Sequence, residues 1–260
     1  MKILFIGDIV GKGGREAVRA LTPGLRREYG CDFCIANAEN IAGGSGMNKN
    51  CLQALFDGEV DVCTSGDHVW DQKQFAAEIE SLPNVLRPAN YPGTQPGKGY
   101  GVYTSESGQQ VAVLCLLGRT FMAVGAECPF AAAERIVPEL KKITPLIVID
   151  FHAEASSEKI ALGRFLDGQV SAVLGTHTHV PTADQQVFPG GTAFQCDVGM
   201  VGARESVIGR ALQPVIARFR HSMPQRFSVV EKGIRLHGCV VSVDDKGRAR
   251  GIERVLRDLP

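Results

Sequence analysis

The sequence lacks an excess of charge of either sign, because its 28 Lys and Arg residues balance its 28 Asp and Glu residues. Proteins that bind nucleic acid regardless of its sequence carry a strongly basic surface, so double-stranded nucleic acid is not an expected partner. A small nucleotide could still bind at a local site. The charge balance therefore excludes one class of partner without excluding nucleotide chemistry.

The sequence also has no apolar run that reaches the ~20 residues needed to span a bilayer. The apolar stretch at the amino terminus, MKILFIGD, is too short for a signal peptide, because a polar residue follows after a few positions. Internal repeats, low-complexity tracts and obvious linkers are equally absent. We therefore expect a soluble cytoplasmic protein, with no membrane partner, that forms a single domain over residues 1–260.

The eight cysteines show no pairing pattern. Most lie in or beside apolar runs, as in DVCTSG and VAVLCLLG, which is typical of buried cysteines in a reducing compartment. Cys31 and Cys34 form a C-x-x-C motif, but this segment predicts a strand, and neither a second motif nor an active-site helix follows. The spacing therefore gives little support to a redox or zinc site.

Short apolar runs alternate with helical patterns through most of the chain. Strands are predicted at 2–7, 32–38, 60–66, 145–153 and 170–177, and helices at 14–30, 48–58, 70–82, 130–143 and 156–168. A β-hairpin is predicted at 99–118, and strand patterns recur at 185–197 and 226–255. The alternation predicts a parallel sheet covered by helices, and the β-rich end adds a second sheet.

Polar side chains follow five of the predicted strands at their carboxyl ends. They are Asp8, then Glu39 and Asn40, then Asp67 and His68, then His152, and finally His177 and His179. Ligands bind outside the carboxyl ends of the strands of an open α/β sheet, so all these side chains could meet in one place. Each alone has an ordinary interpretation as a turn, cap or surface residue, but the repetition at five strand ends favours a functional site.

Seven of these residues offer oxygen or nitrogen donors for metal, without a thiolate: Asp8, Glu39, Asn40, Asp67, His152, His177 and His179. One divalent ion needs about four to six ligands, so seven indicate two ions that share a carboxylate. Mixed imidazole and carboxylate donors favour iron or manganese, with zinc, cobalt or magnesium as alternatives. Two ions about 3.5–4 Å apart would clamp a phosphoryl group and activate a bridging water.

The ordered motifs GD at 7–8, NAEN at 37–40, GDHVWD at 66–71, DFHAEASSEK at 150–159 and GTHTH at 175–179 resemble the calcineurin-like metallophosphoesterases. The stretches GDIVGKGGR and GTHTHVPTAD are similar to a bacterial branch that includes 2′,3′-cyclic-nucleotide phosphodiesterases. The resemblance covers nearly the whole chain. It implies a four-layer αββα sandwich, in which two mixed β-sheets lie between layers of helices.

The resemblance also implies a role for each site residue. Asp8, Asn40 and His179 would bind one metal ion, Asp67, His152 and His177 would bind the other, and Glu39 would bridge the two. His68 would contact the phosphate and stabilise or protonate the leaving oxygen. A hydroxide bridging the two ions would attack a phosphodiester bond of a small, cyclic nucleotide.

The sequence departs from the superfamily pattern at two positions. Glu39 stands where the superfamily usually has Asp, as it does in this branch, and Asp67 stands where the GNH motif has Asn. Asp67 can still bind a metal through oxygen, but it makes the site less positive. We therefore expect Asp67 to weaken the attraction for dianionic monoesters more than the attraction for monoanionic diesters.

Other functions stay open on the residues alone. A phosphomonoesterase would use the same site, and a regulatory protein could sense a nucleotide there without turnover. An amidohydrolase-like enzyme also has an H-x-H motif, but near its first strand. GDIVGKGGR fails as a Walker loop because Gly13 follows Lys12, and as a dinucleotide fingerprint because of Glu16.

Contacts to the substrate cannot be identified from the sequence. Asn90, Tyr91, Phe121 and Met122 are candidates for contacting a base, and ordinary loop packing explains them equally well. The sequence also leaves open whether the chain forms a homo-oligomer.

Overall fold

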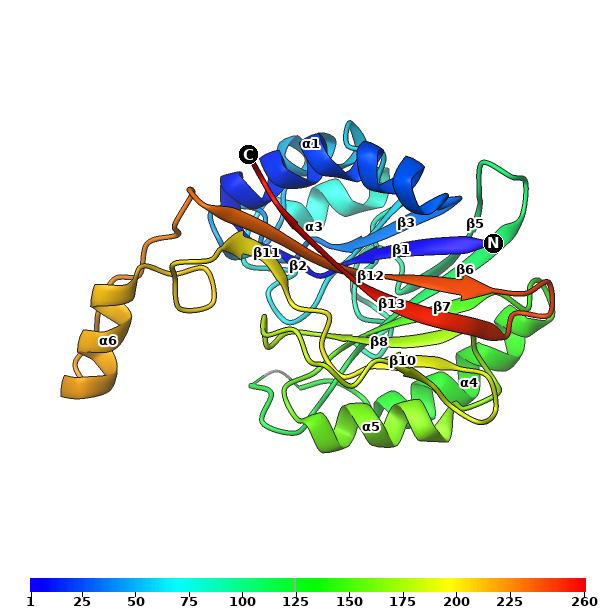
Figure 1. The fold of residues 1–260 in the computed structure, drawn as a ribbon. Helices are drawn as coiled ribbons and strands as arrows, with labels where there is room; N and C mark the ends of the chain where they lie inside the picture. The colour runs from blue at the N-terminus through cyan, green and yellow to red at the C-terminus, as the bar shows by residue number, and fades with distance from the viewer. Residues whose placement is uncertain (124) are drawn as a thin grey trace.

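The computed structural model describes residues 1–123 and 125–260, which form two β-sheets with helices outside both (Figure 1). The first sheet has seven strands: β1 (Lys2–Ile6), β2 (Asp8–Ile9), β3 (Phe33–Asn37), β4 (Val62–Thr64), β11 (Met200–Ala203), β12 (Ile234–Val243) and β13 (Ala249–Asp258). The second has six: β5 (Tyr100–Thr104), β6 (Gln110–Leu117), β7 (Ile147–His152), β8 (Ala172–Thr176), β9 (Gln186–Val187) and β10 (Ala193–Gln195). The helices are α1 (Gly11–Tyr29), α2 (Lys49–Phe56), α3 (Phe75–Glu78), α4 (Pro129–Lys141), α5 (Ser156–Phe165) and α6 (Leu212–His221), with a 3-10 turn η1 (Ile79–Ser81).

The two sheets each contain a parallel block. In the first sheet, β1, β3 and β4 are parallel neighbours, and β12 pairs antiparallel with both β1 and β13. In the second sheet, β6, β7, β8 and β10 are parallel, and β5 and β9 are antiparallel at its edges. The strands of each parallel block end at the same edge of their sheet, which positions the residues that follow them near one another.

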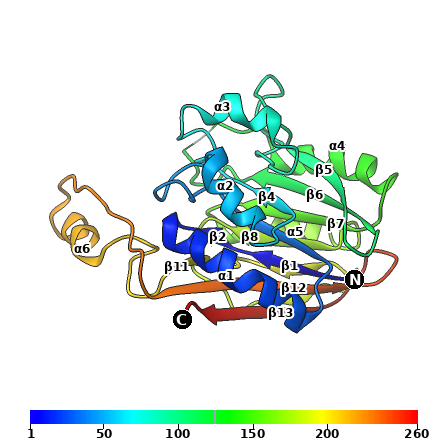
Figure 2. The same ribbon diagram turned by 90° about the horizontal axis from the view of Figure 1, so that it is seen from above.

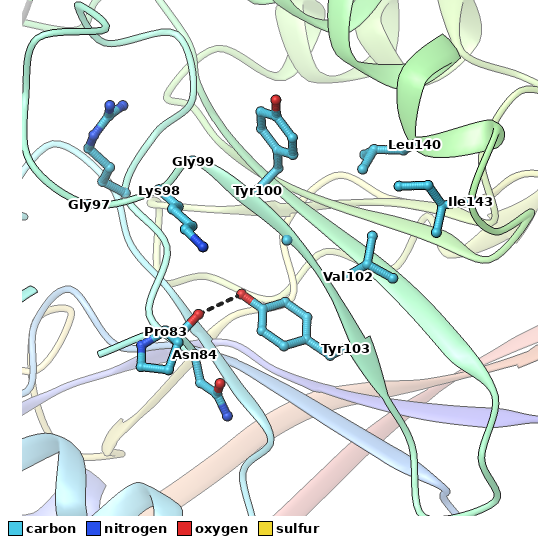
Figure 3. A pocket seen from close by; sticks show the side chains of 12 residues that line it. Pro83, Asn84, Gly97, Lys98, Gly99, Tyr100, Val102, Tyr103, Leu140 and Ile143 are labelled. Carbon is cyan, nitrogen blue, oxygen red and sulfur yellow. Dashed lines mark hydrogen bonds between the residues drawn. The ribbon is translucent and has the colours of Figure 1, made fainter. Parts of the chain in front are cut away.

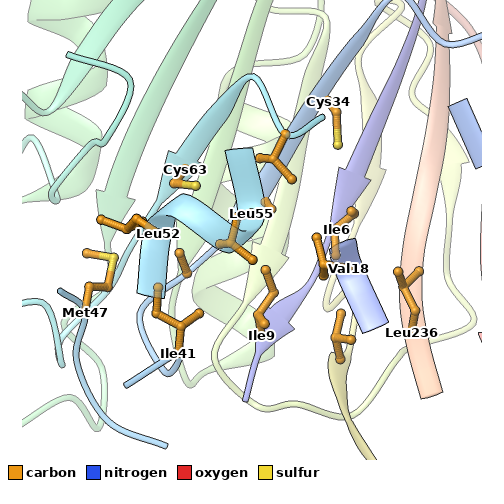
Figure 4. Packing of buried hydrophobic residues seen from close by; sticks show 14 of the residues in the cluster. Ile6, Ile9, Val18, Cys34, Ile41, Met47, Leu52, Leu55, Cys63 and Leu236 are labelled. Atoms are coloured by element: carbon orange, nitrogen blue, oxygen red, sulfur yellow. The ribbon is translucent and has the colours of Figure 1, made fainter. Parts of the chain in front are cut away.

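The side chains of β1 alternate between two different cores, as the period of a strand requires. Leu4 and Ile6 pack with residues of α1 and α2, such as Val18 and Leu52, on the outer face of the first sheet (Figure 4). Ile3 and Phe5 point the other way and pack against the second sheet. The first sheet is therefore buried on both faces.

The second sheet is likewise covered on both faces. Val113 of β6 and Val148 of β7 face the first sheet, whereas Ile147 and Ile149 pack against α4 and α5. The order of layers is thus helices, sheet, sheet, helices, from the top to the bottom of Figure 1. This is the four-layer αββα sandwich that the resemblance implied.

The structure corrects the helix predicted at 70–82. Only Phe75–Ser81 is helical there, as α3 and η1. Side chains before it bond to distant parts of the chain: Trp70 Nε1 donates to Gln95 Oε1 at 2.9 Å, and Asp71 accepts a hydrogen bond from Ser45. These bonds tie residues 70 and 71 to distant parts of the chain, in a segment whose backbone is not helical.

Two smaller predictions also differ from the structure. The helix predicted at 14–30 begins at Gly11. In the tail, residues 226–233 are not in a strand, whereas β12 and β13 account for most of the rest of the strand pattern at 226–255.

Helix α6 was not predicted and stands away from the sandwich (Figures 1 and 2). It belongs to a segment, residues 206–230, that we call the arm. Within the described residues, no helix has the length and apolar character that crossing a membrane requires.

Candidate metal centre

The eight residues singled out in the sequence come together where the parallel strands of both sheets end. Asp8 lies just after β1, while Glu39 and Asn40 follow β3, and Asp67 and His68 follow β4. His152 is the last residue of β7, and His177 and His179 follow β8. The first sheet thus supplies the carboxylates, the amide and His68, and the second sheet supplies the other three imidazoles. We call this cluster the metal centre.

Four of these residues converge on one point. Donor atoms of Glu39, Asp67, His152 and His177 all lie within 4.8 Å of one another. His152 Nε2 lies at the middle of the group, 3.2 Å from Glu39 Oε1, 3.2 Å from Asp67 Oδ1 and 2.9 Å from His177 Nδ1. Carboxylates and imidazoles arranged around a common point are the donor set of a divalent transition metal.

The other three residues lie on the far side of Glu39. Asn40 Nδ2 is 3.0 Å from Glu39 Oε1 and 3.3 Å from His179 Nε2, and His179 Nε2 is 3.9 Å from Asp8 Oδ1. Asp8 Oδ1 is buried and has no hydrogen-bond partner within the described part of the chain. A buried carboxylate oxygen without a partner is costly, and a cation would satisfy it.

Hydrogen bonds fix which nitrogen of two histidines faces the cluster. The Thr176 hydroxyl donates to Asp150 Oδ1 at 2.6 Å, so it accepts from His152 Nδ1, which is 2.9 Å away. His179 Nδ1 donates to the carbonyl oxygen of Ile208 at 3.2 Å. In neutral rings, both Nε2 atoms then present a lone pair to the cluster, as metal-binding histidines do.

The backbone of the His177–His179 loop is strained, because His177 and His179 have φ values of 101° and 65°. Asp197 holds this loop in place. Its Oδ2 accepts hydrogen bonds from the Thr178 backbone N–H at 3.0 Å, from the Thr178 hydroxyl at 2.8 Å and from Lys159 Nζ at 2.8 Å. Lys159 and Asp197 are both buried, so they form an interior ion pair directly under the loop.

Burial and charge act in opposite directions on the pKa values of the cluster. Burial raises the pKa of Asp8 to about 8. Burial also disfavours the ionised forms of Glu39 and Asp67, but the charge and hydrogen bonds of His152 outweigh it and lower the pKa of both. For His152, burial is outweighed by Glu39 and Asp67, so its pKa is raised. Cations bound here would take over the neutralisation that a proton on His152 provides.

Glycine is the only residue type that fits at position 66 without a clash. A Cβ atom there would overlap the ring of His152 and the carboxylate of Glu39. The glycine of the GDH motif therefore lets the β4 end pass directly beside the cluster.

His68 borders a cavity of 350 Å³ next to the cluster, together with Glu39, His177, His179 and Arg210. The His68 ring is partly exposed, and its Nδ1 donates to Asp71 Oδ2 at 2.8 Å. The carboxylate orients the ring, which can then present Nε2 to a bound molecule. Arg210 is the one Lys or Arg side chain among the described residues that line this cavity.

A larger cavity, of 720 Å³, lies elsewhere, beside the edge strand β5 (Figure 3). It is lined by residues such as Tyr100, Leu140 and Ile143, and the Tyr103 hydroxyl there donates to the Pro83 carbonyl oxygen at 3.1 Å. It contains none of the eight residues of the metal centre. Cavity size alone would therefore have pointed away from the metal centre.

The candidates for contacting a base divide between packing and exposure. The Asn90 side chain donates to the carbonyl oxygens of Leu117 and Glu127 and accepts from the Leu117 N–H. Its amide group is therefore occupied by hydrogen bonds within the protein. Tyr91 is buried, Met122 is half-buried and Phe121 is exposed. Asn90 therefore has the packing role.

The C-x-x-C cysteines are free thiols. Cys31 and Cys34 are both buried, and burial raises the pKa of the Cys31 thiol to about 11. Such thiols are poor nucleophiles and poor metal ligands.

Four residues that support the site were missed in the sequence: Asp71, Asp150, Lys159 and Asp197. Asp197 follows β10, so the strand-end pattern that identified the other residues also applies to it. Asp150 lies inside the apolar run of β7, and Lys159 lies on α5, where its partner is 38 residues away in the sequence. No local pattern signals these two.

Comparison with known proteins places the whole chain in one family. A family described as YmdB-like protein matches residues 4–255. The 2′,3′-cyclic-nucleotide 2′-phosphodiesterase of Bacillus subtilis is 45% identical over 257 residues, which cover 98% of this chain and 97% of that protein.

Two crystal structures have nearly the same fold. A hypothetical protein from Thermus thermophilus is 39% identical with a TM-score of 0.93, and the match covers all of both chains. A novel phosphatase from Mycoplasma pneumoniae is 32% identical with a TM-score of 0.92, and the match covers 99% of this chain and 93% of that one.

These similarities confirm the resemblance to the metallophosphoesterases and to their cyclic-nucleotide phosphodiesterase branch, and with it the prediction of a hydrolase of phosphoester bonds. The sequence match spans nearly all of the chain, and the described fold agrees with it throughout. The chain belongs to the YmdB-like protein family.

Proposed function

We propose that the metal centre binds two divalent cations and hydrolyses phosphodiester bonds of small, cyclic nucleotides. One observation carries the proposal: four donor side chains converge, three more lie on the far side of Glu39, and Thr176 and the Ile208 carbonyl orient two of the imidazoles with Nε2 inward. Such pre-orientation of donors is characteristic of metal sites rather than of chance ion pairs.

The donors divide into two groups around one carboxylate. Asp8, Asn40 and His179 would hold one cation, Asp67, His152 and His177 the other, and Glu39 would contact both. Iron or manganese fits this mixed set best, with zinc, cobalt or magnesium as alternatives. When bound, the cations would act as Lewis acids toward the phosphate and lower the pKa of water.

The neighbouring side chains would then act on the substrate. His68, oriented by Asp71, would contact the phosphate and donate a proton from Nε2 to the leaving oxygen. Arg210 would place a positive charge at the other side of the cavity. Attack by water leaves no covalent bond between enzyme and substrate, so the chain needs no nucleophilic side chain.

The relatives support the nature of the substrate. The Bacillus subtilis protein is named a 2′,3′-cyclic-nucleotide 2′-phosphodiesterase, and the shared sequence spans nearly its whole length. The cavity of 350 Å³ is in the range of small-molecule sites. That the protein acts in the cytoplasm stays a prediction.

Metal analysis of the purified protein, followed by a panel of cyclic nucleotides, other diesters and monoesters, tests the proposal. We expect about two metal ions per chain and faster turnover of cyclic nucleotides than of monoesters. His68→Ala should keep the metal and lose turnover by at least about a hundredfold. His237→Ala, on β12 and outside the cavity, is the matched control.

Other results would contradict the proposal in distinct ways. Cyclic nucleotides that bind without turnover would indicate a sensor. Preferential turnover of monoesters would indicate a phosphomonoesterase. Protein that takes up no metal from a solution of Fe²⁺ or Mn²⁺ would exclude the metal centre itself.

A further inference from the structure

A layer of polar side chains lies between the two sheets, next to the metal centre. In four strands, the last apolar residue that faces the other sheet is followed two positions later by a polar residue. Since side chains two positions apart share a face of a strand, these polar residues point into the same space. They are Asn37 of β3, Thr64 of β4, Asp150 of β7 and Thr176 of β8, all completely buried, and we call them the polar layer.

Asp150 is the common acceptor of the polar layer. Its Oδ2 accepts hydrogen bonds from Asn37 Nδ2 at 3.0 Å and from the Thr64 hydroxyl. Its Oδ1 accepts from the Thr176 hydroxyl at 2.6 Å. The three donors come from both sheets, so one carboxylate ties the ends of β3, β4 and β8 to β7.

The carboxylate is an expensive means of joining two sheets. Burying it costs free energy even when hydrogen bonds satisfy it, and its three partners are neutral side chains. Two positions earlier in the same strands, apolar side chains such as Val148 and Leu174 fill the space between the sheets without that cost. The polar layer therefore has a role that apolar packing does not supply.

Two members of the polar layer contact metal donors directly. The Thr176 hydroxyl, which donates to Asp150, accepts from His152 Nδ1 at 2.9 Å. Asn37, which also donates to Asp150, accepts at its Oδ1 from the backbone N–H of Glu39 at 3.2 Å. His152 is at the middle of the cluster, and Glu39 lies between the two groups of donors. The polar layer thus acts on the two central ligands.

We propose that Asp150 is a positioning residue for the metal centre, which acts on His152 through Thr176 and on Glu39 through Asn37. This inference rests on the proposed metal binding and names the group that sets its geometry. The Thr176 hydroxyl has one hydrogen atom, and Asp150 accepts it. The hydroxyl oxygen is then an acceptor toward His152 Nδ1, which keeps the lone pair of the neutral ring on Nε2, facing the metal.

An amide at position 150 cannot keep all of these bonds, because it has one acceptor oxygen and one NH₂ donor group. If the NH₂ group faces Thr176, the hydroxyl loses its acceptor and donates to His152 Nδ1, and the ring proton moves to Nε2, where it blocks the metal. If the NH₂ group faces Asn37, two NH₂ groups meet and the bond that holds the end of β3 is lost. Both orientations disturb a metal ligand.

The dissociation constant for Mn²⁺, measured by competition with a chelator on the loaded full-length protein, tests the proposal. We expect Asp150→Asn and Thr176→Val each to raise it about 10–100-fold, which is the usual effect of removing a group that orients a metal ligand. Thr176→Ser keeps the hydroxyl and should restore an affinity near the native value. Thr176→Val carries the test if Asp150→Asn does not fold.

Thr192→Val is the matched control. Thr192 is equally buried, and its hydroxyl donates to the Val170 carbonyl oxygen at 2.7 Å. It precedes β10, which is parallel to β8, so it lies at the end of the second sheet opposite to the metal centre. Thr192→Val should lower the urea midpoint of the metal-free protein, as Thr176→Val does, and leave the dissociation constant for Mn²⁺ unchanged.

Two results would overturn the positioning role alone. One is a native dissociation constant in both Asp150→Asn and Thr176→Val. The other is an equal rise in Thr192→Val, which would trace the loss of affinity to stability. Native protein that binds no Mn²⁺ would overturn the metal centre and this role with it. Affinity that depends on Asp150, in a protein without phosphodiester turnover, would support the role and contradict the proposed hydrolysis.

Discussion

In the metal centre, Asp8, Glu39 and His152 are almost completely buried although each can carry a charge. In the arm, Phe219 and Met223 are mostly exposed although neither has a polar atom that water would solvate well. The two regions therefore depart from ordinary burial in opposite directions. Buried charge is rare unless it is paired or bound to metal, and clustered exposed apolar residues are rare unless they meet a partner.

The comparison shows that neither region is complete by itself. The metal centre gathers oxygen and nitrogen donors around one point, and Asp8 Oδ1 has no hydrogen-bond partner among the described residues, which fits cations. The arm has apolar area in excess of its cover within the part of the chain that the structure describes. Variants in the two regions should therefore have separable effects, and four experiments can break or sharpen that separation.

The largest effect is expected from His152→Ala. This change removes the imidazole at the middle of the cluster and leaves Glu39 and Asp67 without the group that neutralises them. We expect the rate of phosphodiester hydrolysis to fall about a thousandfold and the metal content to fall with it. Both are measured on one preparation, by initial rates and by elemental analysis. A variant that keeps native metal content would contradict the assignment of His152 as a ligand.

Lys159→Met should strongly destabilise the protein, because it leaves Asp197 buried without its cation. The expected loss in the free energy of unfolding is about 3–5 kcal/mol, measured in urea. The control is Arg257→Met, which breaks an exposed pair with Glu28 and should cost less than about 1 kcal/mol. Equal losses for the two variants would show that the buried pair has no special role.

Asp67→Asn should change substrate preference more than it changes activity. It restores the amide of the superfamily motif and makes the site more positive by one charge. A monoester dianion carries one more negative charge than a diester monoanion. The interaction of that charge with the added positive charge of the site, about 4 Å away in water, is worth about 1 kcal/mol. The ratio of diester to monoester hydrolysis should therefore fall about fivefold. Steady-state rates on both substrate types measure this ratio. An unchanged ratio would rule out the charge explanation.

The smallest effect is expected in hydrogen exchange of the native protein. Backbone amides of α6, a ten-residue helix with an exposed apolar stripe of Leu212, Ile216 and Phe219, should exchange faster with solvent than amides of the buried strands β1 and β7. Hydrogen exchange followed by mass spectrometry resolves these segments. Equal loss of protection in both would show that the arm and the sandwich unfold as one unit.

The sequence predicted the metal centre well because the relevant pattern is local. Each ligand follows an apolar strand, and parallel strands bring their ends to one edge whatever the details of the loops. Glu39 and His177 could therefore be assigned to one cluster from sequence positions far apart. That they bind metal, and how they divide between two ions, stays a prediction.

What the sequence could not predict depends on long-range partners. The helix expected at 70–82 is shorter in the structure, where Trp70 and Asp71 bond to the distant residues Gln95 and Ser45. Helix α6 was missed because its apolar residues are mixed with arginines, and its apolar stripe has no cover among the described residues. Asp150 has its partners on other strands, so its role becomes visible only once the sheets are assembled.

The donors of the metal centre come from both sheets, and this determines at which stage of synthesis and folding metal can bind. The donors extend from Asp8 to His179, and β1, which begins at Lys2, pairs with β12, which begins at Ile234. A nascent chain therefore has all seven donors only after residue 179 is synthesised, and it completes its first sheet later still. Capture of metal is thus expected to be a late step that follows, and then secures, the meeting of the two sheets.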